Sequence, residues 1–447
     1  MGSNAVLMTN GSIYKKIVKF ALPIFWGNLF QQLYNIVDSL VIGNFVGRDA
    51  LAAVSSTGSL IFLLVGLFGG IFMGAGVVIS KYFGAGEEEN VQTAIHTAIS
   101  FGIIAGVILT ILGTLLSPQI LRLMGTPETV FSQAVLYVRI YFAGILSIVM
   151  YNTASGIFQA VGDSKHPLYY LIISSIVNVV LDLLFVAVFK MGIAGAAIAT
   201  VIAQGVSMIL AFYHLMHTKD IYKVSLKKIK VNGFMLKQIL RMGIPAGIQN
   251  SVIALANVVV QSNINSFGAI AVAGCGAYSK IEGFAFIPIT SFAFSMTTFI
   301  GQNLGAKEYD RAKKGTYFGI VVSMVLAEVV GIVFYIMAPK LIALFNSEVA
   351  VVQYGTLQAR TIAIFYFLLA FSHCLAGILR GAGKSVIPMA VMLVCWCVIR
   401  VLYVTIATHF VPKIQTVFWA YPLTWSLSSI IFLIYYLKSD WIHGFEN

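Results

Sequence analysis

Charged residues are scarce in this chain. They make up 10% of its 447 residues, whereas hydrophobic residues make up 59%, and the mean hydropathy is +0.92. Soluble domains carry about 25% charged residues, so the composition excludes an ordinary globular protein. Long apolar runs lack the alternation of barrel strands and provide the roughly 20 residues that a helix needs to cross a bilayer. The composition therefore indicates an all-α polytopic membrane protein.

Cysteine and histidine are also few. We interpret the four cysteines, which lie in apolar runs, as packing residues. The Cys395-Trp396-Cys397 spacing fits neither a zinc site nor a CxxC redox pair, and the seven histidines do not cluster. The sequence shows no nucleophile–base or metal constellation of a membrane enzyme. We therefore expect no enzymatic activity, no resident metal and no cofactor.

Polar breaks divide the apolar sequence into about twelve spans. We place them near residues 15–44, 52–80, 91–117, 132–161, 165–189, 193–216, 238–267, 271–300, 313–338, 353–380, 385–410 and 415–437. The alternate loops that share a side with the N-terminus and the central linker collect nineteen lysines and arginines, against five on the other side. This bias predicts that both termini are cytoplasmic. It also explains the net charge of +12 without a nucleic-acid partner.

The breaks also suggest a division into domains. We interpret residues 1–7 as an expression scar and exclude them from the fold. Residues 8–217 are expected to form one six-helix bundle, residues 218–237 a basic cytoplasmic linker, and residues 238–447 a second six-helix bundle.

The two halves of the chain repeat each other at a nearly constant offset. KKIVKFALPIFWGN matches LKQILRMGIPAGIQN with Pro23 over Pro245, and GIFQAVGDSKHP matches GILRGAGKSVIP. Each half has an even number of spans, so both enter the membrane in the same orientation. We expect two pseudo-symmetric bundles related by an axis along the membrane normal, with a ligand site at their interface. Pro23 and Pro245 each permit a kink, and we interpret Pro23 as a hinge of the first span.

Four acidic residues fall within predicted spans: Asp38, Asp182, Glu282 and Glu328. A charge at the bilayer centre costs about 3 kcal/mol on insertion scales, so each acid is a candidate for function or for a buried polar tie. Glu328 has no polar neighbour in the sequence, and we interpret it as structural or interfacial.

Two of these acids are expected to lie at a similar depth in the membrane. At a rise of about 1.5 Å per residue, Asp182 lies about 12 Å inside the outer end of its span, with Asn178 one turn deeper on the same face. Thr200 lies at a comparable depth on the returning span, and Asp38 roughly 10 Å below the outer surface. We therefore predict one layer of two carboxylates, an amide and a hydroxyl in the first bundle.

This layer suits a coupling ion. Two carboxylates in a poorly solvated site bind a proton readily, and hard oxygen ligands also suit Na⁺. The residues leave H⁺ and Na⁺ both open. In the second half Val260 aligns with Asp38 and Tyr403 with Asp182, so we expect the ion site in the first bundle alone.

The second half carries a different acid. Glu282, with Phe284 and Phe286 alongside, either lines a cavity for organic cations or forms a buried tie to another helix. Lys280, two residues from Glu282, faces nearly the opposite side of the helix and is not expected to pair with it. Arg400, deep in its span, needs an acceptor that the sequence does not identify.

Taken together, these residues resemble the multidrug and toxic compound extrusion (MATE) transporters. The resemblance rests on two six-helix halves, on NIVDSLVIG in the first span and on the GAG and GAK loops after the second and eighth spans. It covers the chain from about Ile13 to Leu437. Asp38, Asn178, Asp182 and Thr200 match the cation site of the prokaryotic branch named for DNA-damage-inducible protein F.

The resemblance implies a V-shaped pair of bundles with alternating access, and export of cationic or amphipathic organic compounds in exchange for H⁺ or Na⁺. It implies helix bending at Pro23, a multi-pass location in a prokaryotic inner membrane, and small organic molecules and lipid as partners. We expect a monomer. A flippase for lipid-linked precursors, an activity of related families, is the alternative.

Overall fold

The computed structural model describes residues 6–445, apart from the side chains of ten positions between residues 48 and 65. The predicted scar therefore lies outside the described residues except for Val6 and Leu7. The backbone N–H of Val6 donates to the carbonyl of Val161 (3.0 Å), and the interpretation of this segment stays a prediction.

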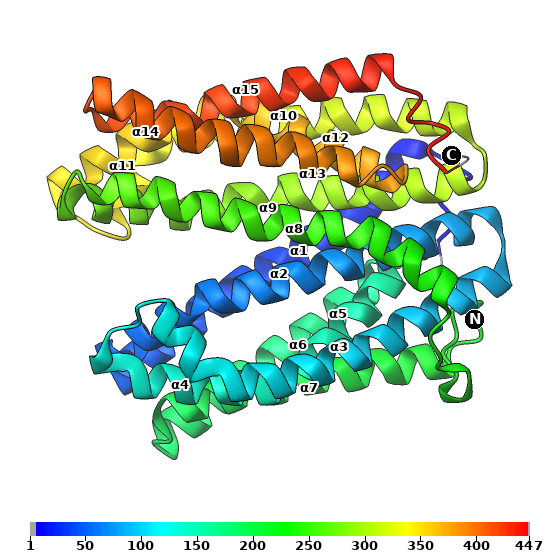
Figure 1. Cartoon of the computed structure of the whole chain (residues 1–447), viewed down its shortest axis with the longest axis horizontal. Coiled ribbons are helices and arrows are strands. Elements are labelled where there is room, and N and C mark those ends of the chain that lie inside the picture. Colours follow the sequence, from blue (N-terminus) through cyan, green and yellow to red (C-terminus); the bar gives the residue numbers. More distant parts are fainter. Residues whose placement is uncertain (1–5, 446–447) are drawn as a thin grey trace. The chain divides into compact units, whose positions relative to one another are not determined.

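Helices form the regular structure, and the described residues contain no strand. Figure 1 shows them in chain order from blue to red. The α-helices are α1 (Ile13–Val41), α2 (Arg48–Ala85), α3 (Glu88–Leu123), α4 (Glu128–Ala143), α5 (Ile145–Ala160), α6 (Lys165–Asp182), α7 (Gly192–His217), α8 (Gly233–Asn265), α9 (Ala269–Gly305), α10 (Tyr309–Ala343), α11 (Val349–Ile362), α12 (Tyr366–Gly381), α13 (Val386–Met392), α14 (Arg400–Phe410) and α15 (Ile414–Lys438).

Five short segments differ from the α-helical geometry. The π-helical segments are η1 (Ile42–Val46), η2 (Leu183–Val188) and η5 (Leu393–Ile399), and the 3₁₀ segments are η3 (Leu226–Lys228) and η4 (Ala363–Phe365). Each π segment directly continues an α-helix, so it does not interrupt the span that contains it.

The twelve predicted spans correspond to twelve helical stretches within the described residues. Ten helices are long and apolar enough to cross a bilayer, and α4 with α5 provides an eleventh if the two, bent by 49°, form one span. The remaining stretch is α1, which is less apolar because it carries Gln31, Gln32, Asn35 and Asp38. The prediction of an all-α polytopic membrane protein is confirmed.

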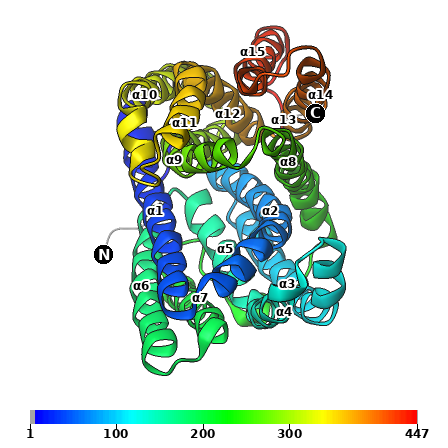
Figure 2. The same cartoon turned by 90° about the vertical axis from the view of Figure 1, so that its left-hand side faces the viewer.

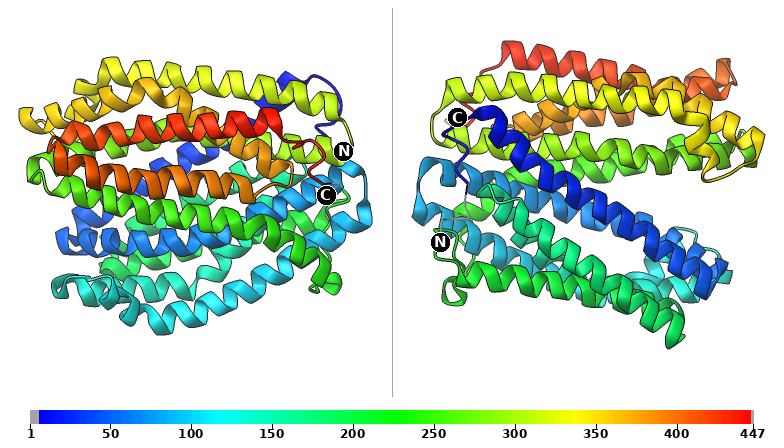
Figure 3. Two further views of the ribbon diagram at one scale, coloured as in Figure 1. Left: turned by 45° about the horizontal axis from the view of Figure 1, so that its top comes forward. Right: turned by 180° about the vertical axis from the view of Figure 1, so that it is seen from behind.

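Two compact units divide the chain, at points that differ from the predicted boundaries. Unit 1 comprises residues 1–7 and Trp26–Ile244, and unit 2 comprises Met8–Phe25 and Pro245–Asn447. The first turns of α1 thus belong to the unit that holds the second half of the chain. The right-hand view of Figure 3 shows α1, in dark blue, as one continuous ribbon.

Packing explains why the first turns of α1 belong to unit 2. Ile17, Phe20 and Ile24 are buried in its core together with residues of α9, α10 and α12. The Ser295 hydroxyl donates to the carbonyl of Ile17 (3.2 Å). These apolar side chains recur at the three- and four-residue spacing of one helix face, so this face binds the turns to unit 2.

The predicted linker is a strap on unit 1. Tyr222 and Val224 are buried in the core beneath it, and the Ser225 N–H donates to His96 Nε2 (3.0 Å). The amide of Gln92 donates to the carbonyls of Ile221 and Lys223. The basic composition of residues 218–237 marked them as a membrane-external segment, but it could not show that they pack on α3.

Both divisions between the units fall close to a proline. The chain passes from unit 2 to unit 1 within α1, two residues after Pro23, and back within α8, immediately before Pro245.

Within unit 2, Figure 2 shows α9, α10, α11 and α12 nearly end on. Small residues allow helices to approach closely within each unit. A side chain at Gly355 on α11, for example, would collide with the carbonyl of Gly274 on α9 (2.8 Å).

Candidate functional site

Unit 1 brings together side chains from the three helices that the sequence singled out. Asn178 on α6 donates its amide to Thr200 Oγ1 on α7 across 3.5 Å, and that hydroxyl donates to the carbonyl of Ala196 (3.1 Å). Asn178 and Asp182 are 1% and 0% exposed. They are four residues apart, which places both side chains on one face of α6.

The two carboxyl groups of the layer lie against each other. Asp38 on α1 and Asp182 on α6 are near enough for a hydrogen bond once one of them is protonated. Neither ionised group can donate. Accordingly, four buried oxygens lack a donor within the described part of the chain: both of Asp182, Oδ1 of Asp38 and Oδ1 of Asn178.

Such oxygens are costly in a dry site because buried charges normally have a partner. A proton between the carboxyls would turn one of them into a donor. A small hard cation would instead take the same oxygens as ligands. The three side chains that carry these oxygens, together with Thr200, therefore fit a monovalent coupling ion, either H⁺ or Na⁺.

Three tyrosines border this layer that the sequence reasoning missed. Tyr34, one turn before Asp38 on α1, donates to Thr200 Oγ1 across 3.5 Å. Tyr137 and Tyr141 on α4 stack with ring centroids 6.4 Å apart, and Tyr137 interacts electrostatically with Asp38 and Asp182. The four-residue spacing of Tyr34 from Asp38 was the signal that could have identified it.

A narrow polar gap, too small to hold a water molecule, adjoins the layer on the same helices. It is lined by Gln31 and Tyr34 of α1, Leu171, Ser174, Ser175 and Asn178 of α6, and Ala203 and Gln204 of α7. Polar side chains three or four residues apart therefore continue from each carboxyl group toward the N-terminus of α1 and of α6. π-helical segments follow both acids: η1 begins four residues after Asp38, and η2 immediately after Asp182. Such segments often occur at functional sites.

In unit 2 the structure places Glu282 in a hydrogen-bonded chain. Tyr278 Oη donates to Glu282 Oε1 (2.9 Å) and lies 2.9 Å from Tyr366 Oη on α12. Lys280 instead lies over the ring of Phe345, with Nζ 5.6 Å from its centroid, so Lys280 and Glu282 do not pair, as expected. The hydrogen bond of Glu282 thus lies within α9, and its side chain is half-buried, so both interpretations of Glu282, as a cavity-lining residue and as a buried tie, stay predictions.

The two phenylalanines next to Glu282 lie on different sides of α9. Phe286 follows Glu282 by one turn and makes an edge contact with the ring of His373 (6.1 Å between centroids). Phe284, only two residues on, points to nearly the opposite side and is half-buried. The predicted trio is therefore not one surface, because the helical period separates its middle position from the other two.

The acceptor that the sequence could not identify for Arg400 lies on α15. Its Nε and Nη2 donate to Thr424 Oγ1 (3.1 and 2.9 Å). Glu328, the remaining intramembrane acid, accepts the N–H of Phe367 (3.4 Å), which is in keeping with a structural role.

A protein-family model matches this chain. The model, MatE, matches residues 23–184 and again residues 245–406, which together exceed half of the chain. The chain belongs to the MatE family. The predicted resemblance is thereby confirmed, and so is the internal repeat, because the two matches begin at Pro23 and Pro245, the prolines that the repeat pairs. The assignment to the branch named for DNA-damage-inducible protein F stays a prediction.

Known proteins that are similar to this chain match it over most of their length. The probable multidrug resistance protein YoeA of Bacillus subtilis is 28% identical over 433 residues, covering 95% of this chain and 94% of YoeA. The probable multidrug resistance protein NorM of Thermotoga maritima is 24% identical and covers 85% and 82%. A solved structure of a multidrug resistance MATE family transporter in an outward-facing conformation covers both chains fully, with a TM-score of 0.92 and 23% identity. The fold is therefore the MATE fold.

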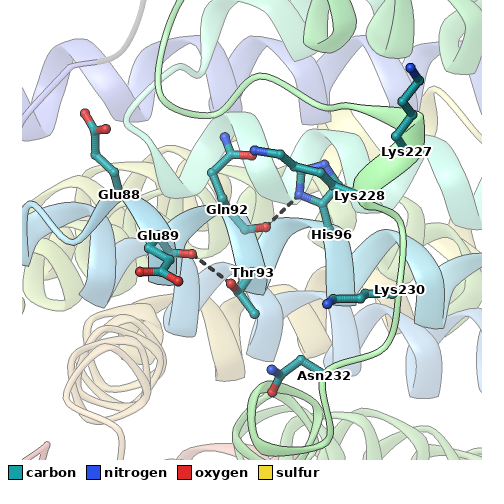
Figure 4. Close-up of a pocket in the computed structure, with 9 residues that line it drawn as sticks. All are labelled: Glu88, Glu89, Gln92, Thr93, His96, Lys227, Lys228, Lys230 and Asn232. Atoms are coloured by element: carbon teal, nitrogen blue, oxygen red, sulfur yellow. Dashed lines mark hydrogen bonds between the residues drawn. The ribbon is translucent and has the colours of Figure 1, made fainter.

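A larger cavity of this MatE-family chain lies elsewhere in unit 1. It measures about 660 Å³ and lies between the first turns of α3 and the strap. Figure 4 shows Glu88 and Glu89 on one side, and Lys227, Lys228 and Lys230 on the other. It contains none of the residues of the carboxyl layer, so we do not place ion coupling there.

Proposed function

We propose that this MatE-family chain is a secondary active exporter of cationic or amphipathic organic compounds, driven by antiport of H⁺ or Na⁺ through alternating access. Both termini are cytoplasmic in this proposal, and the membrane is a prokaryotic inner membrane. The names of its relatives, which are called multidrug resistance proteins, support the substrate class.

The observation that carries the proposal is the carboxyl pair of unit 1. Asp38 and Asp182 lie against each other, and their buried oxygens have no donor among the described residues. Such a pair repels itself when both groups are ionised, and a proton or Na⁺ removes that repulsion. The ion therefore favours whichever conformation brings the two carboxyls together.

Coupling follows from this preference. If organic substrate favours the conformation with separated carboxyls, substrate and ion each weaken the binding of the other by the same factor. Pro23 lies in α1 two residues before the helix passes into the unit that holds Asp38. It lacks an N–H to bond the preceding turn, so α1 can bend there as the two carboxyls approach.

Transport in liposomes tests the proposal. Purified protein is reconstituted and a cationic dye is loaded, and Na⁺ and H⁺ gradients are then imposed separately. We expect efflux with one of the two gradients in the wild type, and none in Asp38→Asn or Asp182→Asn. Efflux in either variant at the wild-type rate would contradict the assignment. Movement of a lipid-linked precursor without dye efflux would instead favour the flippase alternative.

A further inference from the structure

The cavity of about 660 Å³ between α3 and the strap has no part in the proposed ion coupling. Its size lies in the range of small-molecule sites, about 300–1,000 Å³. His96 on α3, which is 3% exposed, joins its two walls. Nδ1 of His96 donates to the carbonyl of Gln92 on α3 (2.7 Å), and Nε2 accepts the N–H of Ser225 on the strap (3.0 Å). The walls are therefore held in place independently of any ligand.

The two walls carry opposite charges. The acidic wall consists of Glu88 and Glu89 in the first turn of α3, and the basic wall consists of the strap lysines Lys227, Lys228 and Lys230. Figure 4 shows Lys228 and Lys230 extending toward α3, whereas Lys227 points away from them. No ion pair joins the two walls among the residues that the structure describes. A cavity that keeps unpaired charges of both signs apart is complementary to a ligand that carries both signs.

The basic wall also offers an uncharged donor. The backbone N–H of Asn232 donates to Thr97 Oγ1 (3.3 Å), and Asn232 Oδ1 accepts the N–H of Met235 (3.0 Å). These bonds fix the side chain and leave its amide NH₂ group without an acceptor in the part of the chain that the structure describes. Together with the ammonium groups of Lys228 and Lys230, this amide can bind the oxygens of a phosphate.

The position of the cavity points to a lipid. Both α3 and α8 are long and apolar enough to cross a bilayer, and the cavity lies beside the first turn of α3 and the residues just before α8. It is therefore at the level where the spans leave the membrane, which is the level of the phospholipid headgroups. Exposed apolar side chains next to the lysines can contact acyl chains: Leu226, Val231 and Phe234, which are 68%, 43% and 66% exposed.

We propose that this cavity binds the headgroup of phosphatidylethanolamine, with the phosphate at the basic wall and the ammonium at the acidic wall. Phosphatidylglycerol carries no amine for the glutamates. Phosphatidylcholine carries a quaternary amine, which has no N–H group to donate. The site therefore prefers phosphatidylethanolamine to both lipids. The bound headgroup connects the strap to α3 in addition to the bond between Ser225 and His96.

Native mass spectrometry of the purified, delipidated full chain measures this preference. The wild type should bind phosphatidylethanolamine at least about 5-fold more tightly than phosphatidylglycerol or phosphatidylcholine. Glu88→Gln/Glu89→Gln removes the partners of the ammonium and should abolish or reverse the preference over phosphatidylglycerol. Lys228→Gln/Lys230→Gln removes the partners of the phosphate and should weaken the binding of all three lipids.

The matched control is Lys219→Gln/Lys223→Gln, which removes two lysines of the same strap that do not line the cavity. It should keep the preference of the wild type. All of the substituted side chains are exposed, so each variant should fold, and its melting midpoint checks this.

Two kinds of result would overturn the proposal. Free phosphoethanolamine in large excess should not displace the lipid, because it lacks the acyl chains, and full displacement would refute the assignment to a lipid. Equal binding of phosphatidylethanolamine and phosphatidylglycerol by the wild type, or an unchanged preference in Glu88→Gln/Glu89→Gln, would refute the assignment of the walls. No transport is measured, so the result is independent of whether the carboxyl pair of unit 1 couples antiport.

Discussion

Replacing Asp182 by asparagine removes a charge from the carboxyl layer while keeping the size of the side chain. In the wild type the coupling ion neutralises a pair whose buried oxygens have no other donor within the described residues. An ion at about 100 times its dissociation constant stabilises the folded state by about 2.7 kcal/mol. For a unit of this size, that corresponds to a rise in melting midpoint of about 5–10 °C.

Differential scanning fluorimetry of detergent-purified protein measures this response. The midpoint of the wild type should rise as Na⁺ replaces a bulky cation at constant ionic strength, or as the pH is lowered. The melting midpoint should rise in both titrations, because Na⁺ and H⁺ each neutralise the carboxyl pair. The melting midpoint of Asp182→Asn should no longer depend on the ion, Na⁺ or H⁺, that raises it in the wild type.

A matched control is available in unit 1. Asp163 is also buried (4% exposed) but accepts the N–H groups of Lys165 and His166 at the start of α6. Asp163→Asn should lower stability and yet retain the ion response. A wild type that is indifferent to both ions, or an Asp182→Asn variant that responds as the wild type does, would refute the reasoning.

Three further predictions concern Tyr34, Pro23 and the strap. Tyr34→Phe removes the hydrogen bond to Thr200 and should raise the ion concentration for half-maximal efflux by about 2- to 10-fold; an unchanged value would exclude Tyr34 from the site. Pro23→Ala should slow efflux while leaving the ion-dependent rise of the melting midpoint unchanged. Pro245→Ala is the control for the general effect of removing a proline from a helix. Loss of the midpoint rise in Pro23→Ala would mean that Pro23 shapes the ion site itself. His96→Ala removes the acceptor of the Ser225 N–H and should speed tryptic cleavage of the strap; cleavage at the wild-type rate would show that this bond does not hold the segment.

Several features of the site could be predicted from the sequence because they depend on local geometry. The regular rise of an α-helix was enough to place Asp38, Asp182 and Thr200 at one depth. The four-residue spacing placed Asn178 below Asp182 on the same face of α6. Hydropathy alone delimited the spans, because the bilayer fixes the length of each helix.

Contacts between distant helices could not be predicted in this way. Thr424 on α15 accepts the N–H groups of Arg400 on α14, and periodicity within one helix says nothing about the rotation of the next. Tyr137 was inconspicuous among 20 tyrosines until α4 was placed beside the carboxyls. The unit boundaries differed from the prediction for a related reason, because charge marks where the chain leaves the membrane but not which core a helix turn joins.

Equilibrium binding of a cationic dye, measured at several pH values and Na⁺ concentrations, tests the central claim most directly. If the Asp38–Asp182 pair binds the coupling ion in competition with substrate, the affinity of the wild type for dye falls as that ion is added. Asp38→Asn should bind dye with an affinity that no longer depends on the ion. A wild-type affinity that stays constant across both titrations would contradict the account and leave the carboxyl layer with a structural role alone.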